Sequence, residues 1–421
     1  MSEDLLQTIQ RLQFSDQNTA QELLTSFIQD TFRLDVVKVE LRPVAVSLNS
    51  FNGFVTVSDG TRLFFKTHTE PDNVIGEYYN AERLATSGYP VIQPIFISTE
   101  AGKQFLIYKE INDPSVFDVA WDIENGDSSK FTALVEAQHH ADNLLERLFH
   151  ETYAFQSSEA ALEAPIHQLF YHRLIGGRFT RFYGAIPGQA GNQAYWIDLP
   201  GVRSDMGTVR KVYWHINGQE YHISLDDLVI SAVRLLTPGQ PGPSIIGHGD
   251  AHNGNIFLQE QNGIPSLLYF DPAFAGRHDP LLDLTKPLFH NVFAMWMYFP
   301  REKTALTHIT LNPTQDAWSV EHDYTIHSVR EMFLRSKIER VLIPTLRVLK
   351  EKDALRSDWR AYLKAALFCC PLLTMNLADP GKFTPEMSLL GLTMAIEMGA
   401  DSYGQRSLID RTLDEVEQAI I

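Results

Sequence analysis

The chain of 421 residues has only two cysteines, Cys369 and Cys370, and they are adjacent. Two neighbouring cysteines cannot form the disulfide framework of a small secreted domain, so we expect a reducing, cytoplasmic compartment. Long apolar runs are also missing, because no stretch reaches the roughly 18 residues that a membrane-spanning helix needs. The N-terminus lacks the basic start and apolar centre of a signal peptide. We therefore expect no membrane partner.

Basic residues are scarce as well. Lys and Arg number 35 against 52 Asp and Glu, which gives a formal net charge of −17. General nucleic-acid binding requires a net basic surface, so we expect no nucleic-acid partner. The acidity is compatible with a cationic substrate, although a net charge does not define a pocket. The length is sufficient for two or three domains with a large core.

The first third of the chain predicts an α+β unit that begins with helices. Residues 1–35 form an N-terminal helical segment, with Ser15 and Asp16 as candidate caps between two helices. Residues 36–68 contain three β-rich runs, and the turn at 58–60 is typical of a hairpin.

Residues 74–88 favour a helix that ends at Gly88. Two further strands are expected at 90–98 and 104–111. Residues 36–111 thus predict a small antiparallel sheet with one inserted helix, the N-terminal lobe of an α+β protein.

Residues 112–421 predict a second, larger and mostly helical lobe, reached through a linker near 110–116. Residues 212–224 carry an Asn-Gly turn and predict a hairpin. Residues 244–271 read as β structure, and everything after 281 as helix-rich. The apolar stretch 365–375 predicts a buried helix that is interrupted at Pro371.

The most informative stretch is HGDAHNGN, residues 248–255, between two predicted strands. A third strand ends at Asp271, and a hairpin would bring that end back to the loop, so that Asp250, Asn255 and Asp271 converge. Asn255 and Asp271 offer hard oxygen ligands suited to Mg²⁺. Asp250 remains to orient a hydroxyl and accept its proton. These are the parts of a phosphoryl-transfer site.

HGDAHNGN, followed about twenty residues later by DPAFAG and then DPLLDL, resembles the aminoglycoside-phosphotransferase and choline-kinase-like family of the protein-kinase-like superfamily. That group also includes homoserine and fructosamine kinases. The resemblance implies a two-lobed α+β fold, with ATP or GTP and Mg²⁺ as co-substrate and cofactor. It covers residues 45–110 and 244–290 well, and the remainder only as helices.

The resemblance also implies nucleotide-binding residues. Lys66 stands where the family has the Lys that contacts the nucleotide phosphates, with Glu77 favoured over Glu82 as its partner. The loop 47–53 is expected to cover the phosphates, with Ser50 and Asn52 as contacts. The adenine is expected to pair with the backbone from Lys109 to Ile111.

Supporting residues are expected beside these. His248 and Asp283 are expected to brace the loop, and His252 either to brace it or to contact the substrate. The run 172–184, with three arginines, reads equally well as a wall of the acceptor pocket or as a packed helical turn. His139, Asp142, Glu146 and His150 share one helix face, which we interpret as a solvated or substrate-facing surface rather than a metal site.

The sequence thus predicts a small-molecule kinase that transfers the γ-phosphate of ATP or GTP to a hydroxyl of an aminoglycoside-like compound, amino alcohol, sugar or related metabolite. Two alternatives use the same fold: a nucleotide-binding pseudokinase without turnover, and a nucleotidyl transferase. Asx turns that only stabilise the loop are the structural alternative for Asp250, Asn255 and Asp271.

Overall fold

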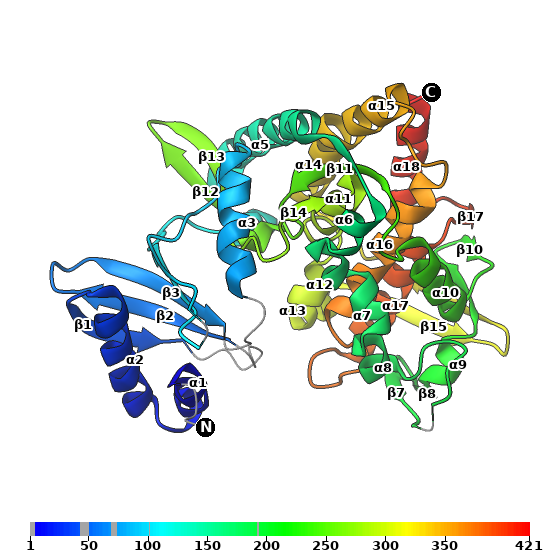
Figure 1. Cartoon of the computed structure of the whole chain (residues 1–421). Helices are drawn as coiled ribbons and strands as arrows, with labels where there is room; N and C mark the ends of the chain where they lie inside the picture. The colour runs from blue at the N-terminus through cyan, green and yellow to red at the C-terminus, as the bar shows by residue number, and fades with distance from the viewer. Residues whose placement is uncertain (1–4, 43–49, 69–73, 101, 192) are drawn as a thin grey trace. The chain divides into compact units, whose positions relative to one another are not determined.

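The computed structural model describes residues 5–42, 50–68, 74–100, 102–191 and 193–421. The chain divides into two compact units (Figure 1). The first comprises Met1–Asp113 and Leu268–Ala273, and the second comprises Pro114–Leu267 and Phe274–Ile421.

The first unit is built on a five-stranded antiparallel sheet with the strand order β1-β2-β3-β5-β4. Its strands are β1 (Val36–Leu41), β2 (Ser50–Val57), β3 (Arg62–His68), β4 (Phe96–Ser98) and β5 (Phe105–Lys109). Its helices are α1 (Leu5–Ser15), α2 (Gln17–Phe32) and α3 (Val74–Thr86). The predicted N-terminal antiparallel sheet with one inserted helix is confirmed.

One face of this sheet packs on α1 and α2. Strand alternation sends Phe65 into that core, together with Phe51, Phe105 and the apolar faces of both helices. Asp16 caps α2 by accepting a hydrogen bond from the Thr19 amide, as predicted. The alternate residues of β2 and β3 therefore lie on the opposite face.

The prediction of a strand over residues 90–98 is wrong for residues 90–95. Only Phe96–Ser98 forms a strand, and Val91 makes a single bridge to Tyr269. Pro90 and Pro94 have no backbone N–H to donate to a ladder, which accounts for the shorter strand. Of the run predicted to start at Val36, residues 43–46 lie outside the described residues.

The second unit is mostly helical. Its α-helices are α4 (Val116–Glu124), α5 (Phe131–Thr152), α6 (Ser158–Leu162), α7 (Tyr171–Ile175), α8 (Arg178–Tyr183), α9 (Met206–Val209), α10 (Leu225–Leu235), α11 (Pro280–His290), α12 (Met295–Tyr298), α13 (Pro300–Leu306), α14 (Ser328–Lys337), α15 (Ile343–Glu351), α16 (Trp359–Thr374), α17 (Pro385–Gly399) and α18 (Leu408–Ala419). Its strands are β6 (Ala154–Gln156), β7 (Trp196–Leu199), β8 (Val202–Asp205), β9 (Tyr213–Ile216), β10 (Gln219–Tyr221), β11 (Gly242–Gly247), β12 (Ile256–Gln261), β13 (Ile264–Tyr269, which enters the first unit at Leu268), β14 (Gly276–His278), β15 (Ile309–Pro313), β16 (Ala317–His322) and β17 (Tyr403–Gly404). A β-rich N-terminal part followed by a larger helical part is the protein-kinase-like α+β class that the sequence predicts.

Helix α16 lies in the core of this unit and packs on α10, α11 and α17. The prediction that it is interrupted at Pro371 is wrong, because the helix continues to Thr374. Pro371 lies in its last turn, so the missing N–H costs a single hydrogen bond near the end. Burial of the apolar residues around Pro371 outweighs that loss. Cys369 and Cys370 lie in the same helix and are buried free thiols.

The region after residue 281 is not purely helical, as β15 and β16 form an antiparallel hairpin. The predicted hairpin β9–β10 turns at Asn217 and Gly218, both with positive φ (49° and 76°). Strand β16 pairs with β9 in parallel, and the Trp214 and Trp318 rings lie 5.5 Å apart between their centroids. The partner strand comes from about a hundred residues further along the chain, which explains why local patterning missed it.

The polar face of α5 is only partly solvated. Asp142 is fully buried, accepts hydrogen bonds from Gln138 and Ser336, and forms an ion pair with Lys337. Asp142 is therefore a buried structural anion, and the prediction that its helix face is solvated or substrate-facing is wrong for this residue. Among the described residues, no group of three or more His, Cys, Asp or Glu side chains is placed to hold a metal ion.

Candidate active site

The loop HGDAHNGN follows β11 and ends in a single 3₁₀ turn, Asn253–Asn255. Gly249 has a φ of 79°, and a Cβ there would lie 2.5 Å from the Phe274 carbonyl oxygen. Only glycine accommodates both the left-handed conformation and this close backbone approach. The loop therefore turns sharply just before Asp250.

Hydrogen bonds within the loop fix Asn255 and His252. The Asn255 side-chain Nδ2 donates to the Asp250 carbonyl at 3.0 Å, which leaves the Asn255 Oδ1 as the atom that can coordinate a cation. The His252 Nδ1 accepts from the Gly254 amide at 3.1 Å, so His252 braces the loop. His248 is buried, and its Nδ1 accepts from the Asp250 amide at 3.4 Å.

The Asp250 carboxylate is surrounded by cationic and imidazole groups. Its Oδ1 is buried and accepts no hydrogen bond within the described part of the chain, and the Lys286 Nζ lies 3.5 Å away. Burial raises the pKa of Asp250. The positive charge of Lys286, with smaller contributions from His252 and Arg173, has the larger effect and lowers this pKa below its usual value. Asp250 is therefore ionised, and because its Oδ1 is fully buried beside Lys286, Oδ2 is the oxygen left for a hydroxyl.

Lys286 belongs to a buried chain of hydrogen bonds that was not predicted from the sequence. Its Nζ donates to the His290 Nε2 at 3.0 Å, and the His290 Nδ1 lies 2.7 Å from the Tyr298 hydroxyl oxygen. Burial, with Lys286, holds the pKa of His290 well below its usual value, so the ring is neutral. Its Nε2 can only accept from the ammonium, so Nδ1 carries the proton and donates to Tyr298. The sequence signal was a lysine on a helix that also holds Asp283 and His290 among apolar residues.

Asp283 connects α11 to the loop. Its Oδ1 accepts from the Gly249 amide at 2.7 Å and lies 2.9 Å from the His278 Nε2. Burial raises the pKa of Asp283, but the His278 hydrogen bond and the Gly249 amide outweigh burial and lower it. An ionised Asp283 thus fixes the backbone immediately before Asp250.

In the first unit, Lys66 and Asp271 form an ion pair. The Lys66 Nζ donates to the Asp271 Oδ1 at 2.8 Å, and both side chains are partly buried. Asp271 has a φ of 55°, a left-handed conformation that Asp tolerates better than most residues. The turn directs its carboxylate toward the strand that carries Lys66.

Lys66 lies on the sheet face opposite the α1–α2 core. Asn52 stands directly opposite Lys66 in the β2–β3 register, so the two share that face. Phe64 lies two residues from Lys66 on the same face, and its ring is within about 6 Å of both Tyr108 and Phe270. These aromatic rings were not singled out from the sequence, and they offer a surface against which a planar base can stack.

The remaining predicted nucleotide contacts are placed as follows. Lys109 ends β5 and is exposed, and Ile111 is half-buried in the segment after it. Ser50 begins β2 and Glu77 lies in α3, but both side chains lie outside the described residues. The rival Glu82 is exposed.

Each unit offers one residue of a type that binds a hard divalent cation. Asp271 in the first unit has a carboxylate and Asn255 in the second unit an amide oxygen, the ligand types that Mg²⁺ prefers in proteins. The Asn255 amide is already oriented by its bond to the Asp250 carbonyl, which presents the oxygen rather than the nitrogen. Each residue taken by itself therefore has the chemistry of a Mg²⁺ ligand.

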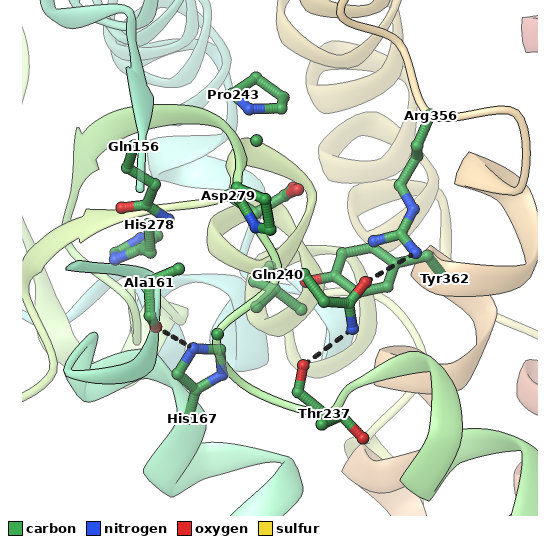
Figure 2. A pocket seen from close by; sticks show the side chains of 14 residues that line it. Gln156, Ala161, His167, Thr237, Gln240, Pro243, His278, Asp279, Arg356 and Tyr362 are labelled. Carbon is green, nitrogen blue, oxygen red and sulfur yellow. Dashed lines mark hydrogen bonds between the residues drawn. The ribbon is translucent and has the colours of Figure 1, made fainter. Parts of the chain in front are cut away.

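A separate polar pocket in the second unit lies beside the Asp283 brace. Figure 2 shows Arg356 directed at Gln240 and lying over the Tyr362 ring, with His278 and Asp279 across the pocket. His278 thus contacts both the pocket and Asp283. None of the predicted site residues lines this pocket.

Asp279 in this pocket gives a test of the fold's electrostatics. It caps α11 by accepting from the Leu281 amide at 2.8 Å, and burial raises its pKa to about 6. A raised carboxyl pKa means that ionisation costs stability. Below pH 3.8, the usual pKa of this carboxyl, Asp279 is protonated in both the folded and the unfolded state and the cost is absent. The cost grows as the pH rises to about 6, the pKa in the folded state, and is complete above it.

We expect Asp279→Asn to raise the free energy of unfolding at pH 7 by on the order of 2 kcal/mol, because Asn keeps a cap acceptor without a charge. Denaturant unfolding from pH 4 to 8 measures this, and the gain should vanish near pH 4. The control is Asp16→Asn at the exposed cap of α2, which should give no gain. A loss of stability in Asp279→Asn at pH 7 would contradict the assignment.

Taken together, the fold and these residues define a chain of the protein-kinase-like class. No family model matches the chain, and no curated protein matches its sequence. In the part of the chain that the structure describes, no helix is long and apolar enough to cross a membrane.

Solved structures resemble this one over most of its length. A thermostable mutant of aminoglycoside phosphotransferase APH(4)-Ia, in a ternary complex with AMP-PNP and hygromycin B, is 11% identical, with a TM-score of 0.47, over 90% of this chain and 98% of its own. Amicoumacin kinase hAmiN, in complex with AMP-PNP, Ca²⁺ and Ami, is 12% identical, with a TM-score of 0.42, over 92% and 94%. An ethanolamine kinase of Plasmodium vivax is 11% identical, with a TM-score of 0.41, over 94% of each chain.

By name, all three are kinases or phosphotransferases of small molecules. They agree with the fold resemblance read from the sequence. At TM-scores below 0.5 the likeness says nothing about activity or substrate, so the function proposed below rests on this chain's own residues.

Proposed function

We propose that this protein is a magnesium-dependent small-molecule kinase that transfers the γ-phosphate of ATP or GTP to a hydroxyl group. The hydroxyl oxygen attacks the γ-phosphorus, the bond from that phosphorus to the β–γ bridging oxygen breaks, and the nucleoside diphosphate leaves. The hydroxyl proton passes to the Asp250 carboxylate. The products are a phosphate ester and ADP or GDP.

The observation that carries this proposal is the state of Asp250. It is ionised beside Lys286 at 3.5 Å, its side chain is partly exposed, and it lies in a loop fixed by Asp283. A carboxylate held in this way orients a hydroxyl and receives its proton. Because its pKa is low, it contributes more by positioning than by strong basicity, which suits a loose phosphoryl-transfer transition state.

The other residues take supporting roles. Lys66 binds the nucleotide phosphates, and the aromatic face around Phe64 stacks on the base. Asp271 and Asn255 hold Mg²⁺, which when bound neutralises developing charge on the phosphates. Glu77, Ser50, Asn52 and the Lys109–Ile111 backbone remain proposed nucleotide contacts.

Identification of the nucleotide product tests the proposed reaction. The protein is incubated with ATP, Mg²⁺ and a set of hydroxyl metabolites, and the nucleotides are separated by ion-exchange chromatography. We expect ADP to accumulate in an acceptor-dependent and Mg²⁺-dependent manner. AMP with an adenylylated acceptor would instead indicate nucleotidyl transfer, and unchanged ATP in protein that binds nucleotide would indicate a pseudokinase.

Lys66→Ala should weaken nucleotide binding as well as turnover, because a phosphate contact acts in both the ground state and the transition state. We expect the nucleotide KM to rise about 10-fold or more and kcat to fall. Steady-state kinetics measures both. Lys103→Ala removes an exposed lysine of the same unit and should change neither. Unchanged nucleotide affinity in Lys66→Ala would remove Lys66 from the site.

A further inference from the structure

Two short helices of the second unit, α7 and α8, carry three arginines and pack at the end of α16. Helices α7 and α8 carry the run that the sequence left open between a pocket wall and a packed turn. Helix α7 packs on α16, and the Arg178 Nη1 donates to the Leu373 carbonyl at 3.1 Å. The Tyr183 hydroxyl donates to the Leu372 carbonyl at 2.8 Å. Both helices are thus fixed to the end of α16, where the Thr374 Oγ1 lies 3.5 Å from the His290 Nε2.

Arg173 on α7 is the exceptional member of this run. Its side chain is half-buried, and within the described chain no hydrogen bond or ion pair engages its guanidinium. Burial lowers its pKa, and the Asp250 carboxylate acts against that effect. Burial, with Arg173 and Arg181, likewise lowers the pKa of Arg178 to about 10. A half-buried guanidinium that no described side chain binds is available to an anionic ligand.

The charges around Asp250 do not cancel. Asp250 and Lys286 compensate each other at 3.5 Å, and His290 is neutral. Arg173 adds a positive charge that no described carboxylate pairs with. The local charge at the candidate acceptor site is therefore positive, although the whole chain is strongly negative.

This sign disfavours an amine substrate. A polyamine or amino alcohol beside Asp250 would face Lys286 and Arg173, and like charges that are partly desolvated repel strongly. Planar guanidinium groups bind carboxylates and phosphates through two parallel hydrogen bonds. The net charge of the chain is compatible with a cationic substrate, but the local charges around Asp250 favour an anionic one.

We propose that the acceptor is a hydroxyl compound that carries a carboxylate or phosphate group, and that Arg173 binds this group while Asp250 receives the hydroxyl. This inference rests on the proposed phosphoryl transfer. Arg173 is assigned to binding the anionic group of the acceptor. Arg178 adds to the positive electrostatic potential there.

A matched set of three-carbon compounds tests the sign of the charge. Glycerol is neutral, glycerate carries a carboxylate, glycerol 3-phosphate carries a phosphate, and 3-amino-1,2-propanediol carries an ammonium. Their binding to the full chain saturated with Mg²⁺ and AMP-PNP is measured by calorimetry. We expect at least one of the two anions to bind about 10- to 100-fold more tightly than glycerol, and the amine to bind more weakly than glycerol. The comparison of glycerate with glycerol 3-phosphate distinguishes the two anion types.

The variant Arg173→Gln tests whether Arg173 is the group that binds the anion. We expect it to abolish the preference for the anion and to leave glycerol and AMP-PNP binding unchanged. Its thermal midpoint should be close to that of the wild type, since no hydrogen bond or ion pair of the described chain is lost. Arg181→Gln, an exposed arginine on α8, is the matched control and should retain the preference. Arg173→Lys should retain part of it.

The two proposals fail in different ways. Tightest binding of the amine, no detectable binding of either anion, or an anion preference that persists in Arg173→Gln would overturn the acceptor inference in a protein that still binds Mg²⁺ and AMP-PNP. A thermal midpoint several degrees lower in Arg173→Gln would assign Arg173 a structural role instead. A wild-type chain that does not bind Mg²⁺ and AMP-PNP would contradict the proposed kinase function itself.

Discussion

Asp271→Ala is expected to lower kcat by on the order of 10³-fold, because it removes the carboxylate that would hold Mg²⁺ on the phosphates. In the first unit this side chain contacts Lys66 at 2.8 Å, so its loss also removes this ion pair from the lysine that is proposed to bind the phosphates. The change lies in a turn after β13, outside the hydrophobic core, and we expect the fold to survive.

Alanine at this position must also adopt a φ of 55°, which costs about 1 kcal/mol. Asp271→Asn is therefore the matched variant, since Asn tolerates this conformation and removes only the charge. Both variants should lose Mg²⁺-dependent turnover to a similar extent, with kcat measured across a Mg²⁺ titration. Mg²⁺-dependent activity near wild type in Asp271→Asn would contradict the metal assignment.

Asp250→Asn is expected to lower kcat by about 10²- to 10⁴-fold and to leave the nucleotide KM nearly unchanged. An amide cannot receive the hydroxyl proton, and Asp250 belongs to the acceptor side of the proposed reaction. Single-turnover kinetics at saturating nucleotide measures the effect on the chemical step.

This variant also leaves the buried Lys286 without the carboxylate that lies 3.5 Å from it, and an uncompensated buried charge can cost about 3–5 kcal/mol. The control is the double variant Asp250→Asn/Lys286→Gln, which removes this cation together with the anion. We expect it to recover thermal stability but not activity. Wild-type kcat in a folded Asp250→Asn protein would remove Asp250 from the reaction.

The local parts of the fold could be predicted from the sequence. Asp16 as a cap, the Asn217–Gly218 turn and the sheet around Lys66 depend on short-range preferences that a single sequence contains. The loop around Asp250 was recognisable for the same reason, because its glycines, Asp and Asn occupy fixed spacings within eight residues.

Other parts depend on packing between distant segments. Strand β16 pairs with β9 across about a hundred residues, and Pro371 is tolerated because it lies in the last turn of its helix among buried apolar residues. Lys286 lies 3.5 Å from the Asp250 carboxylate and comes from a separate helix, α11. Arg173 on α7 also acts to lower the pKa of Asp250. The charge that we propose for the acceptor site is therefore a tertiary property, which the net charge of the chain does not determine.

Transfer of label from ATP to an acceptor tests the central proposal most directly. The chain is incubated with Mg²⁺, ATP labelled at the γ-phosphorus and hydroxyl compounds that carry a carboxylate or phosphate, and small molecules are separated from nucleotide and inorganic phosphate. We predict label in a small molecule that alkaline phosphatase releases as phosphate, formed by the wild type and at least 10²-fold more slowly by Asp250→Asn. Label that stays in ATP, or a labelled ester formed equally fast by Asp250→Asn, would contradict the assignment of this protein as a kinase that uses Asp250.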